Sequence, residues 1–344
     1  MADLADAILR RNSDRSNEPA LICTGQALST IPYTTLDLWV QRIRATLEAA
    51  GLSRGSTCCL ALPNGPAFVA AFIAAIDLKA AIAPLNPALK QSEISHTFES
   101  LQVDLLIGPR DFHKNDDDLI RAANDQDFAL AECYWSENDL VFQIVREQGV
   151  RENSLAGLSS GSDFVALILH TSGTTGRPKA VPLLQSNLRA STNSVIESYG
   201  LTASDRSILI MPLFHIRGIV AGLLAPLLAG SAVIIPDKGL GPDFWSDFDK
   251  HHATWDCYTH APQGLALISK ATGLRSAPLH SIMLFAVGAK SVARAGRYLQ
   301  GTRARSIRYD RERASHIVSR VGSRKNAWHG RLAVPYDLPQ DHRR

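Results

Sequence analysis

A polar loop that follows an apolar run is the feature that most restricts how this chain can fold. Residues 163–169 are almost all apolar and have the length of a buried strand. In residues 171–179, which follow His170, four side chains carry hydroxyls, two residues are glycine and the last is lysine. Glycine lets backbone N–H groups approach an anion closely, and lysine neutralises its charge. The pattern therefore predicts a strand that ends in a phosphate-binding loop.

The loop is not of the Walker type, because G-x-x-x-x-G-K-[ST] is absent and Pro178 precedes Lys179. It resembles the signature loop of the AMP-forming adenylating superfamily, which includes acyl-CoA synthetases, firefly-type luciferases and peptide-synthetase adenylation domains. The sequence of the loop, together with Phe-His-x-x-Gly and Leu-Ala-Pro-Leu further along the chain, is most similar to peroxisomal-type and oxalate-activating CoA ligases. The alternative is a Ser/Thr/Gly loop without a ligand, which rarely combines all these features.

The resemblance implies that a small-molecule carboxylate, ATP and CoA are the partners of the chain. The carboxylate would attack the α-phosphate of ATP, pyrophosphate would leave, and CoA would displace AMP from the acyl-adenylate. Lys179 would offset the phosphate charge as a catalytic residue, and Thr175 would accompany Mg²⁺. The residues expected to hold the phosphates are Thr171, Ser172, Gly173, Thr174, Thr175, Gly176 and Lys179.

Residues 211–218 and 283–290 resemble two further motifs of the superfamily. The first places His215 between a strand and a helix, at the sheet edge where ligands of α/β sheets bind. His215 would close the acyl pocket as a second catalytic residue; alone, such a histidine is more often structural. The second motif would lay Gly288, Ala289 and Lys290 against adenine, since small residues allow a flat base to approach. The alternative is a plain turn.

Trp255, Tyr258 and His260 precede the adenine motif and could wall the acyl pocket, with packing in the core as the equal alternative.

Strand and helix patterns alternate along the chain, which indicates crossover connections and mainly parallel sheets. Helices are expected at residues 33–50, 67–78, 185–199 and 219–228, and strands at residues 57–62, 81–85, 103–107, 163–169, 207–211 and 232–235. The expected fold is α/β, a large adenylating domain with parallel sheets flanked by helices. Between these patterns, residues 115–161 are more charged; we interpret them, with Asp116, Asp117 and Asp118, as a solvated surface segment rather than a metal site.

The resemblance stops near residue 295. The expected domains are therefore an incomplete AMP-binding domain at residues 1–295 and an atypical, arginine-rich tail at residues 296–344. The tail lacks the family's Tyr-Gly-Met-Thr-Glu motif, its ribose-binding aspartate and the small domain with the catalytic lysine. We therefore expect a truncated fold and impaired ligation, with a non-catalytic remnant that still binds nucleotide as the alternative.

A shift of the reading frame would explain why the tail lacks the family's motif. Residues 305–312 can be encoded as CGA AGC ATA CGG TAT GAC CGA GAG, and reading one nucleotide later gives Glu-Ala-Tyr-Gly-Met-Thr-Glu. We hypothesise that the chain runs out of frame from a point between Gly296 and Arg305. A nucleic-acid-binding arm is less favoured, because the tail has no interleaved aromatic platform and no recognisable binding fold.

Composition excludes several classes of protein. The net charge of +3 indicates no strongly charged partner, and five cysteines without C-x-x-C spacing argue against disulfides and zinc. Residues 218–236 are apolar, but Gly222, Pro226 and Gly230 interrupt them, so we expect helix and strand and no membrane span. Without a secretion signal or a visible C-terminal peroxisomal tripeptide, a cytoplasmic or peroxisomal location is expected.

Overall fold

The structure, a computed structural model, describes residues 3–9, 16–25, 30–86, 88–136, 139–147, 163–171, 179–237, 239 and 244–256. All of them belong to one compact unit, Met1–Val292. The predicted site residues Ser172–Gly176 and Gly288–Lys290 and the tail at 296–344 lie outside the described residues.

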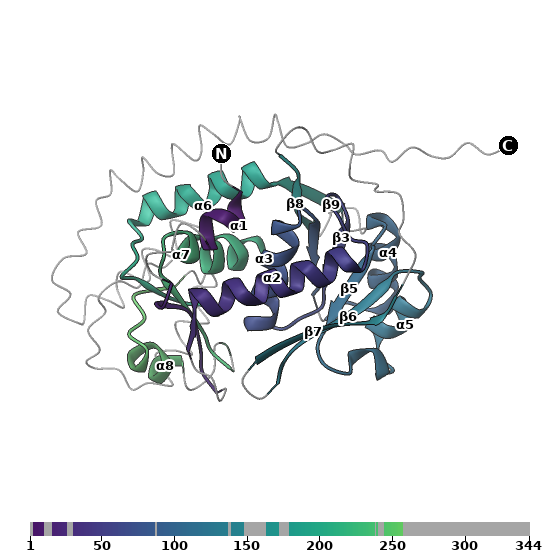
Figure 1. Cartoon of the computed structure of the whole chain (residues 1–344), viewed down its shortest axis with the longest axis horizontal. Helices are drawn as coiled ribbons and strands as arrows, with labels where there is room; N and C mark the ends of the chain where they lie inside the picture. Colours follow the sequence, from purple (N-terminus) through teal and green to yellow (C-terminus); the bar gives the residue numbers. More distant parts are fainter. Residues whose placement is uncertain are drawn as a thin grey trace, which may run out of the picture. The chain divides into compact units, whose positions relative to one another are not determined.

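The larger sheet has seven strands in this part of the chain, in the order β7-β6-β5-β3-β4-β8-β9 (Figure 1). Its four inner neighbour pairs, from β6 to β8, are parallel, whereas β7 and β9 at the edges are antiparallel to their neighbours. The mainly parallel arrangement predicted from the sequence is confirmed. Its strands are β3 (Thr57–Leu60), β4 (Ala81–Pro84), β5 (Leu105–Gly108), β6 (Ala129–Ser136), β7 (Asp139–Arg146), β8 (Val165–Thr171) and β9 (Lys179–Leu184).

The smaller sheet has five strands among the described residues, in the order β12-β10-β11-β1-β2. Only β2 runs antiparallel to its neighbour. The strand β1 pairs on one side with β2, which follows it directly, and on the other with β11, so that Leu21 lies opposite Val233. Its strands are β1 (Pro19–Cys23), β2 (Thr30–Pro32), β10 (Arg206–Ile208), β11 (Ala232–Ile235) and β12 (Trp255–Asp256).

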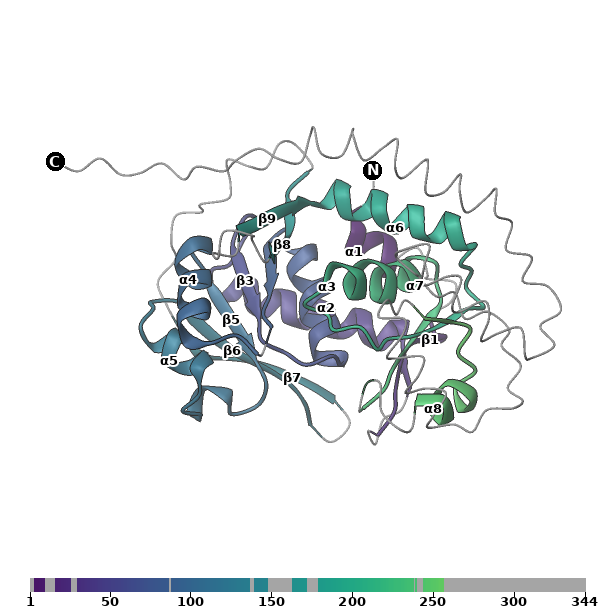
Figure 2. The same cartoon turned by 180° about the vertical axis from the view of Figure 1, so that it is seen from behind.

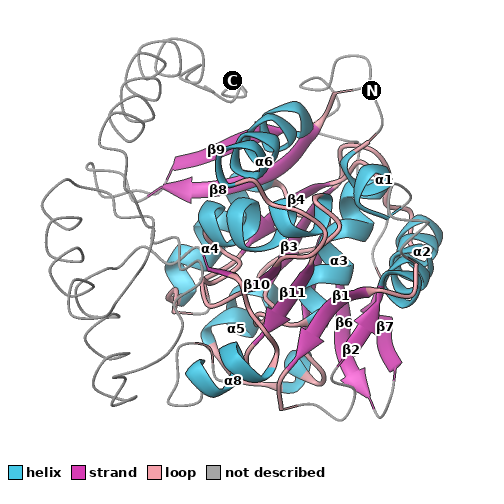
Figure 3. Ribbon diagram, turned by 90° about the vertical axis from the view of Figure 1, so that its left-hand side faces the viewer, coloured by secondary structure: helices cyan, strands magenta, loops and turns pink. Residues whose placement is uncertain are grey.

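Helices cover both faces of the sheets (Figures 2 and 3). The helices α4 and α5 lie beside β5 and β6 on the side away from α2 and α3 (Figures 1 and 2). The helices are α1 (Leu4–Leu9), α2 (Tyr33–Ala49), α3 (Pro66–Asp77), α4 (Gln91–Leu101), α5 (Asp118–Asn124), α6 (Gln185–Tyr199), the π-helix η4 (Gly218–Leu224), α7 (Ala225–Leu228), α8 (Phe244–Lys250) and the short 3₁₀ turn η2 (Phe112–Lys114).

Alternation of side chains along the strands divides the core into layers. Cys58 and Leu60 of β3 pack in one cluster with Leu21 of β1 and with α1, α2, α3 and α7, whereas Cys59 packs on the opposite face with α4 and α5. In the smaller sheet, Ile22 faces away from that shared cluster toward α8. Because successive side chains of a strand point to opposite faces, short apolar strands supply two layers at once. The two sheets therefore share one apolar layer of helices between them.

The helix α3 lies in that shared layer. It has apolar side chains on all sides, starts with Pro66 at its first turn, and buries Phe68 and Phe72 almost completely. Proline is tolerated at this position because its missing N–H would be unpaired anyway. Burial of each phenylalanine contributes about 1.5–3 kcal/mol. This helix anchors the turn that precedes it, which contains Asn64.

The predicted helix at 219–228 is present but wound differently. Its first part, Gly218–Leu224, is a π-helix, and only Ala225–Leu228 is α-helical. Pro226 explains the change, since proline cannot donate to the carbonyl of Gly222 and would clash with it in an α-helix. That carbonyl accepts a hydrogen bond from Ser207 Oγ (3.4 Å) instead.

Residues 115–161 were interpreted as a solvated segment, which is wrong for their described middle part. Residues 129–133 of β6 are buried within the larger sheet. The signal was hidden by Glu132, a charged residue in an apolar run. Glu132 is 2% exposed and receives hydrogen bonds from Asp111 N (2.7 Å) and Gln143 Nε2 (2.9 Å), with His113 Nδ1 at 2.7 Å. The partners that make burial of this carboxylate acceptable come from other strands and turns, so local periodicity does not reveal them.

The remaining expectations concern the cysteines and membrane spans. Cys23, Cys58, Cys59 and Cys133 are all free and buried. Burial raises the pKa of the Cys23 and Cys133 thiols to about 12. No helix among the described residues is both long enough and apolar enough to span a membrane.

Candidate functional site

The predicted phosphate loop joins two strands that pair directly with each other. β8 and β9 form an antiparallel ladder in which Thr171 lies opposite Lys179. Directly opposed residues in such a ladder have Cα atoms about 4.5–5.5 Å apart. The two ends of the predicted loop are therefore held together by the hairpin itself, and the exposed side chain of Lys179 starts at this point. Pro182 lies in β9, which is an edge strand and so tolerates a residue without an N–H.

The other end of this hairpin is fixed by Asp163, just before β8. Its Oδ2 accepts a hydrogen bond from Ser186 Oγ (2.6 Å) and its Oδ1 one from Ser186 N (3.1 Å), while its carbonyl accepts one from Arg54 Nη2 (2.9 Å). Ser186 is the second residue of α6, whose first N–H groups lack partners within the helix. Asp163 thus caps α6 from a distance and ties it to the hairpin.

His170 is the residue of β8 next to the predicted loop. Its Nε2 is buried and has no hydrogen-bond partner among the described residues. Burial, and to a lesser degree the nearby imidazole of His96, lowers the pKa of His170 below its usual value. The imidazole is therefore neutral at pH 7.

The second predicted motif forms a compact turn at the carboxyl edge of the smaller sheet. Leu209 still continues the ladder by donating to Ile234 O (2.8 Å), and the chain turns from Met211 onward. His215 is exposed; its N–H donates to Pro212 O (3.1 Å) and its carbonyl accepts from Ile219 N (3.1 Å). The rings of Phe214 and His215 have centroids 4.5 Å apart at 52°. The strand-to-helix placement predicted for His215 is what the structure has.

Glycine is required at the end of this turn. A Cβ atom at Gly218 would lie 2.4 Å from Pro212 O and 3.1 Å from Met211 O. No side chain fits there without a shift of the backbone, because both neighbours are main-chain atoms.

Asn64 holds the beginning of the same turn, although it is nearly 150 residues away. Its Nδ2 donates to Met211 O (2.9 Å) and its Oδ1 accepts from Leu213 N (2.9 Å). Asn64 follows β3 of the larger sheet, so these bonds connect the carboxyl edges of the two sheets. Sequence reasoning missed this residue; the available signal was a polar side chain in a turn directly after a buried strand.

Of the residues considered for the acyl pocket, Trp255 is described, whereas Tyr258 and His260 lie outside the described residues. Trp255 is 3% exposed and packs with Met211 and Ala221, and its ring lies 5.2 Å from that of Tyr199. Its indole Nε1 is buried without a hydrogen-bond partner in the described part of the chain. Trp255 therefore supports the His215 turn from the core side.

The acidic residues near 117 do not form a metal site. Asp117 caps α5 by accepting from Ile120 N (3.0 Å), and Arg121 pairs with Asp116 (2.9 Å) and Asp118 (3.0 Å). No group of three or more His, Cys, Asp or Glu side chains in the described ranges could hold a metal ion.

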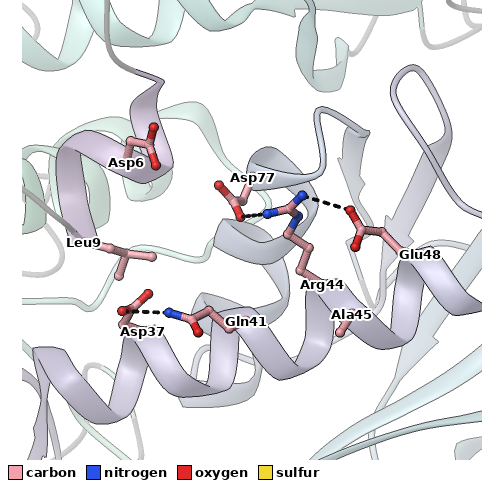
Figure 4. A pocket seen from close by; sticks show the side chains of 8 residues that line it. All are labelled: Asp6, Leu9, Asp37, Gln41, Arg44, Ala45, Glu48 and Asp77. Atoms are coloured by element: carbon pink, nitrogen blue, oxygen red, sulfur yellow. Dashed lines mark hydrogen bonds and ion pairs between the residues drawn. The ribbon is translucent and has the colours of Figure 1, made fainter.

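A pocket of about 420 Å³ lies away from these motifs, between α1, α2 and the end of α3 (Figure 4). Its single arginine, Arg44, is already paired with Glu48 (2.9 Å) and Asp77 (3.2 Å). None of the predicted site residues lines it. The lining residues are Asp6, Leu9, Asp37, Gln41, Arg44, Ala45, Glu48 and Asp77.

Comparison with known proteins extends the likeness over most of the chain. The profile of the family described as "AMP-binding enzyme" matches residues 9–298. An oxalate–CoA ligase of Arabidopsis thaliana is 36% identical over 265 residues, which cover 76% of this chain and 50% of that protein. One of Saccharomyces cerevisiae is 34% identical over 224 residues, covering 59% and 41%. The chain spans about half the length of the curated relatives it matches.

Solved structures show the same fold. An o-succinylbenzoate CoA synthetase of Bacillus subtilis, in complex with its acyl-adenylate intermediate, superposes with a TM-score of 0.65 at 21% identity, covering 83% of this chain and 54% of that one. The N-terminal domain of a Mycobacterium tuberculosis protein, bound to an inhibitor, gives 0.66 at 19% identity, covering 81% and 68%. The α/β adenylating fold predicted from the sequence is confirmed.

Proposed function

The chain belongs to the family of AMP-binding enzymes, and on that basis we propose that it carries the nucleotide-binding domain of an AMP-forming carboxylate–CoA ligase. The observation that carries the proposal is the hairpin of β8 and β9. It places the backbone of Thr171 opposite that of Lys179, at the two ends of a loop rich in glycine and hydroxyl groups. A loop of this kind offers N–H and O–H donors to phosphate oxygens, and a lysine at its end offsets their charge.

The proposed reaction has two steps. A carboxylate oxygen attacks the α-phosphorus of ATP and the bond to the pyrophosphate oxygen breaks, which gives acyl-AMP; the thiol of CoA then attacks the acyl carbon and AMP leaves. Residues 171–176 and Lys179 would hold the β- and γ-phosphates, and Gly288, Ala289 and Lys290 would lie against adenine. His215 would border the acyl group. Positioning and charge neutralisation carry most of the catalysis in such transfers.

Mg²⁺ would accompany the nucleotide. Its preferred ligands are oxygens, and the hydroxyl of Thr175 together with phosphate oxygens would supply them without a cage of carboxylates. The ion would neutralise charge on the phosphates.

Nucleotide binding tests the proposal directly. ATP with Mg²⁺ should raise the melting temperature of the chain, and Lys179→Ala should weaken binding by about 1.5–3 kcal/mol through loss of one charge-assisted contact. Lys79→Ala is the matched control. Lys79 lies before β4, at the amino ends of the parallel strands, whereas the loop follows the carboxyl end of β8. Equal affinities of wild type and Lys179→Ala would contradict the role of the loop.

A second function, nucleotide binding without turnover, is favoured by one observation: residues 296–344 do not contain the Tyr-Gly-Met-Thr-Glu motif. Carboxylate-dependent release of pyrophosphate and formation of CoA thioesters separate the two functions. Oxalate is tested first, because relatives 34% and 36% identical are oxalate–CoA ligases, followed by short, medium and aromatic acids. We expect turnover far below that of a full-length relative; robust turnover by this chain alone would refute the second function.

The transcript around codons 290–312 tests the reading-frame hypothesis. A one-nucleotide offset or a displaced splice site that restores the missing motif near Tyr309 is the expected result. A transcript in which the printed frame is uninterrupted and translated would contradict it and make residues 296–344 a genuine extension.

A further inference from the structure

Asn64 uses both ends of its side-chain amide on one turn. Nδ2 donates to Met211 O and Oδ1 accepts from Leu213 N, each at 2.9 Å. An amide that donates to one peptide group and accepts from another fixes the position of both, and no other side chain of this size offers a donor and an acceptor in that arrangement. The contact is therefore specific to asparagine at position 64.

A short series of contacts connects these bonds to His215. Pro212 stands between the two peptide groups that Asn64 holds, and its carbonyl accepts from His215 N (3.1 Å). The His215 carbonyl in turn accepts from Ile219 N (3.1 Å) at the start of the π-helix. The backbone at Gly218 packs so closely against Pro212 O that a Cβ atom does not fit between them. The backbone of His215 is thus fixed on one side by the π-helix and on the other by Asn64.

The position of Asn64 relates this turn to the predicted phosphate loop. Asn64 follows β3, and β8 is the second strand along from β3 in the same sheet, with β4 between them. Two strand spacings amount to about 10 Å, so the ends of β3 and β8 lie about that far apart at one sheet edge. Asn64 therefore fastens the turn of the smaller sheet to the edge from which the phosphate loop emerges.

We propose that Asn64 is a positioning residue, which sets the place of the His215 side chain relative to the phosphate loop. The proposal rests on the proposed function, because the place of His215 matters for an acyl-adenylate only if this site binds one. A purely structural role would consist of satisfying two backbone groups beside the buried Met211 and Leu213, and its loss would lower stability without a selective effect on His215.

The first measurement concerns His215 itself and needs no ligand. Diethyl pyrocarbonate acylates accessible imidazoles, and mass spectrometry gives the rate for each histidine. In Asn64→Asp, which retains only the acceptor, and in Asn64→Ala, which retains neither group, the rate at His215 should change by about threefold or more, the equivalent of one net hydrogen bond. The rate at the exposed His252 should stay the same.

The second measurement separates the acyl part of the site from the nucleotide part. The probes are ATP with Mg²⁺ and acetyl-sulfamoyl-adenosine, a stable analogue of an acyl-adenylate. Both Asn64 variants should bind the analogue about tenfold more weakly, the equivalent of one or two hydrogen bonds, and bind ATP within about twofold of wild type.

Two control variants exclude general effects. Asn187→Asp is the matched substitution, because the side chain of Asn187 is used through its Oδ1 acceptor, toward Leu184 N (3.0 Å), which aspartate keeps. Ile107→Val removes one methyl group from a fully buried position of β5 and lowers stability without touching the turn. Neither should alter His215 modification or discriminate between the two probes.

The outcomes are distinguishable. A wild-type chain that binds neither probe overturns the proposed function. A wild-type chain that binds both, with His215 modification and analogue affinity unchanged in Asn64→Asp and Asn64→Ala, overturns the positioning role. Should Asn64→Ala fail to fold, Asn64→Asp alone decides between these results, since it keeps the bond to Leu213.

Discussion

The two segments that carry the proposed chemistry are held in place by different means. The ends of the loop after β8 are joined by the ladder with β9, so residues only eight positions apart close it. The turn that bears His215 is closed at its start by Asn64, which comes from another sheet and is nearly 150 positions away. The closure of the loop is local, because all of its residues lie in one stretch of sequence. The closure of the turn forms only when both sheets are in place. The loop should therefore tolerate distant changes, whereas the turn should not.

The largest effect is expected from Gly218→Ala. The added Cβ would meet Pro212 O at 2.4 Å, and the backbone of the turn must shift, which should cost about 3 kcal/mol of unfolding free energy. Urea denaturation measures it. Gly200→Ala is the control, since Gly200 also ends a segment but has no atoms within 4 Å of its Cβ position; its left-handed φ of 60° should cost only about 1 kcal/mol. Equal losses in the two variants would show that close contact does not hold the turn.

A smaller effect is expected from Asp163→Ala at the base of the hairpin. It removes the cap of α6 formed with Ser186 and should cost about 1 kcal/mol, as the loss of other N-caps does. Affinity for ATP should stay within about twofold, because the ladder itself closes the loop at the opposite end. The exposed Asp125→Ala serves as the control for stability. A tenfold loss of ATP affinity in Asp163→Ala would mean that the loop depends on α6 and is not locally held.

The smallest effect is a pH dependence from His170. Burial lowers its pKa in the folded chain below the unfolded value near 6.5. Below pH 6.5 the unfolded state therefore binds more protons, so the stability that the neutral imidazole contributes is complete above that pH and is lost as the pH falls further. The urea midpoint should drop between pH 7.5 and pH 5.5, and less so in His170→Gln. An unchanged pH slope in that variant, with the exposed His252→Gln as reference, would assign the acid sensitivity to other groups.

What could be predicted from the sequence follows the same division between local and distant contacts. The strand, the loop and Lys179 were found together because apolar length, glycines and charge lie in one run of residues. The place of His215 between strand and helix was predicted for the same reason. Asn64 was not found, because nothing in its neighbourhood shows that its amide reaches Met211 and Leu213.

One missed strand and one helix of unforeseen type have similar physical causes. The strand β6 was missed because Glu132 breaks the apolar pattern, and the groups that pair with it come from the turn after β5 and from β7. The helix expected at 219–228 is present, but the sequence did not show that Pro226 and the hydrogen bond from Ser207 to Gly222 O give its first part a π-helical form. Periodicity reports burial of side chains; it does not report which distant donor will satisfy a carbonyl or a carboxylate.

The place of β1 between β2 and β11 has a consequence for how the chain folds as it is made. β1 and β2 leave the ribosome early and can pair at once, but the other neighbour of β1 is β11, whose residues are added more than two hundred positions later. Until then one edge of β1 offers unpaired N–H and C=O groups. Leu21 and Ile22 still lack the residues of β11 that lie opposite them in the folded sheet. Such an edge invites pairing with a wrong strand or another chain. During synthesis, residues 19–32 are therefore the part of the nascent chain on which we expect chaperones to act longest.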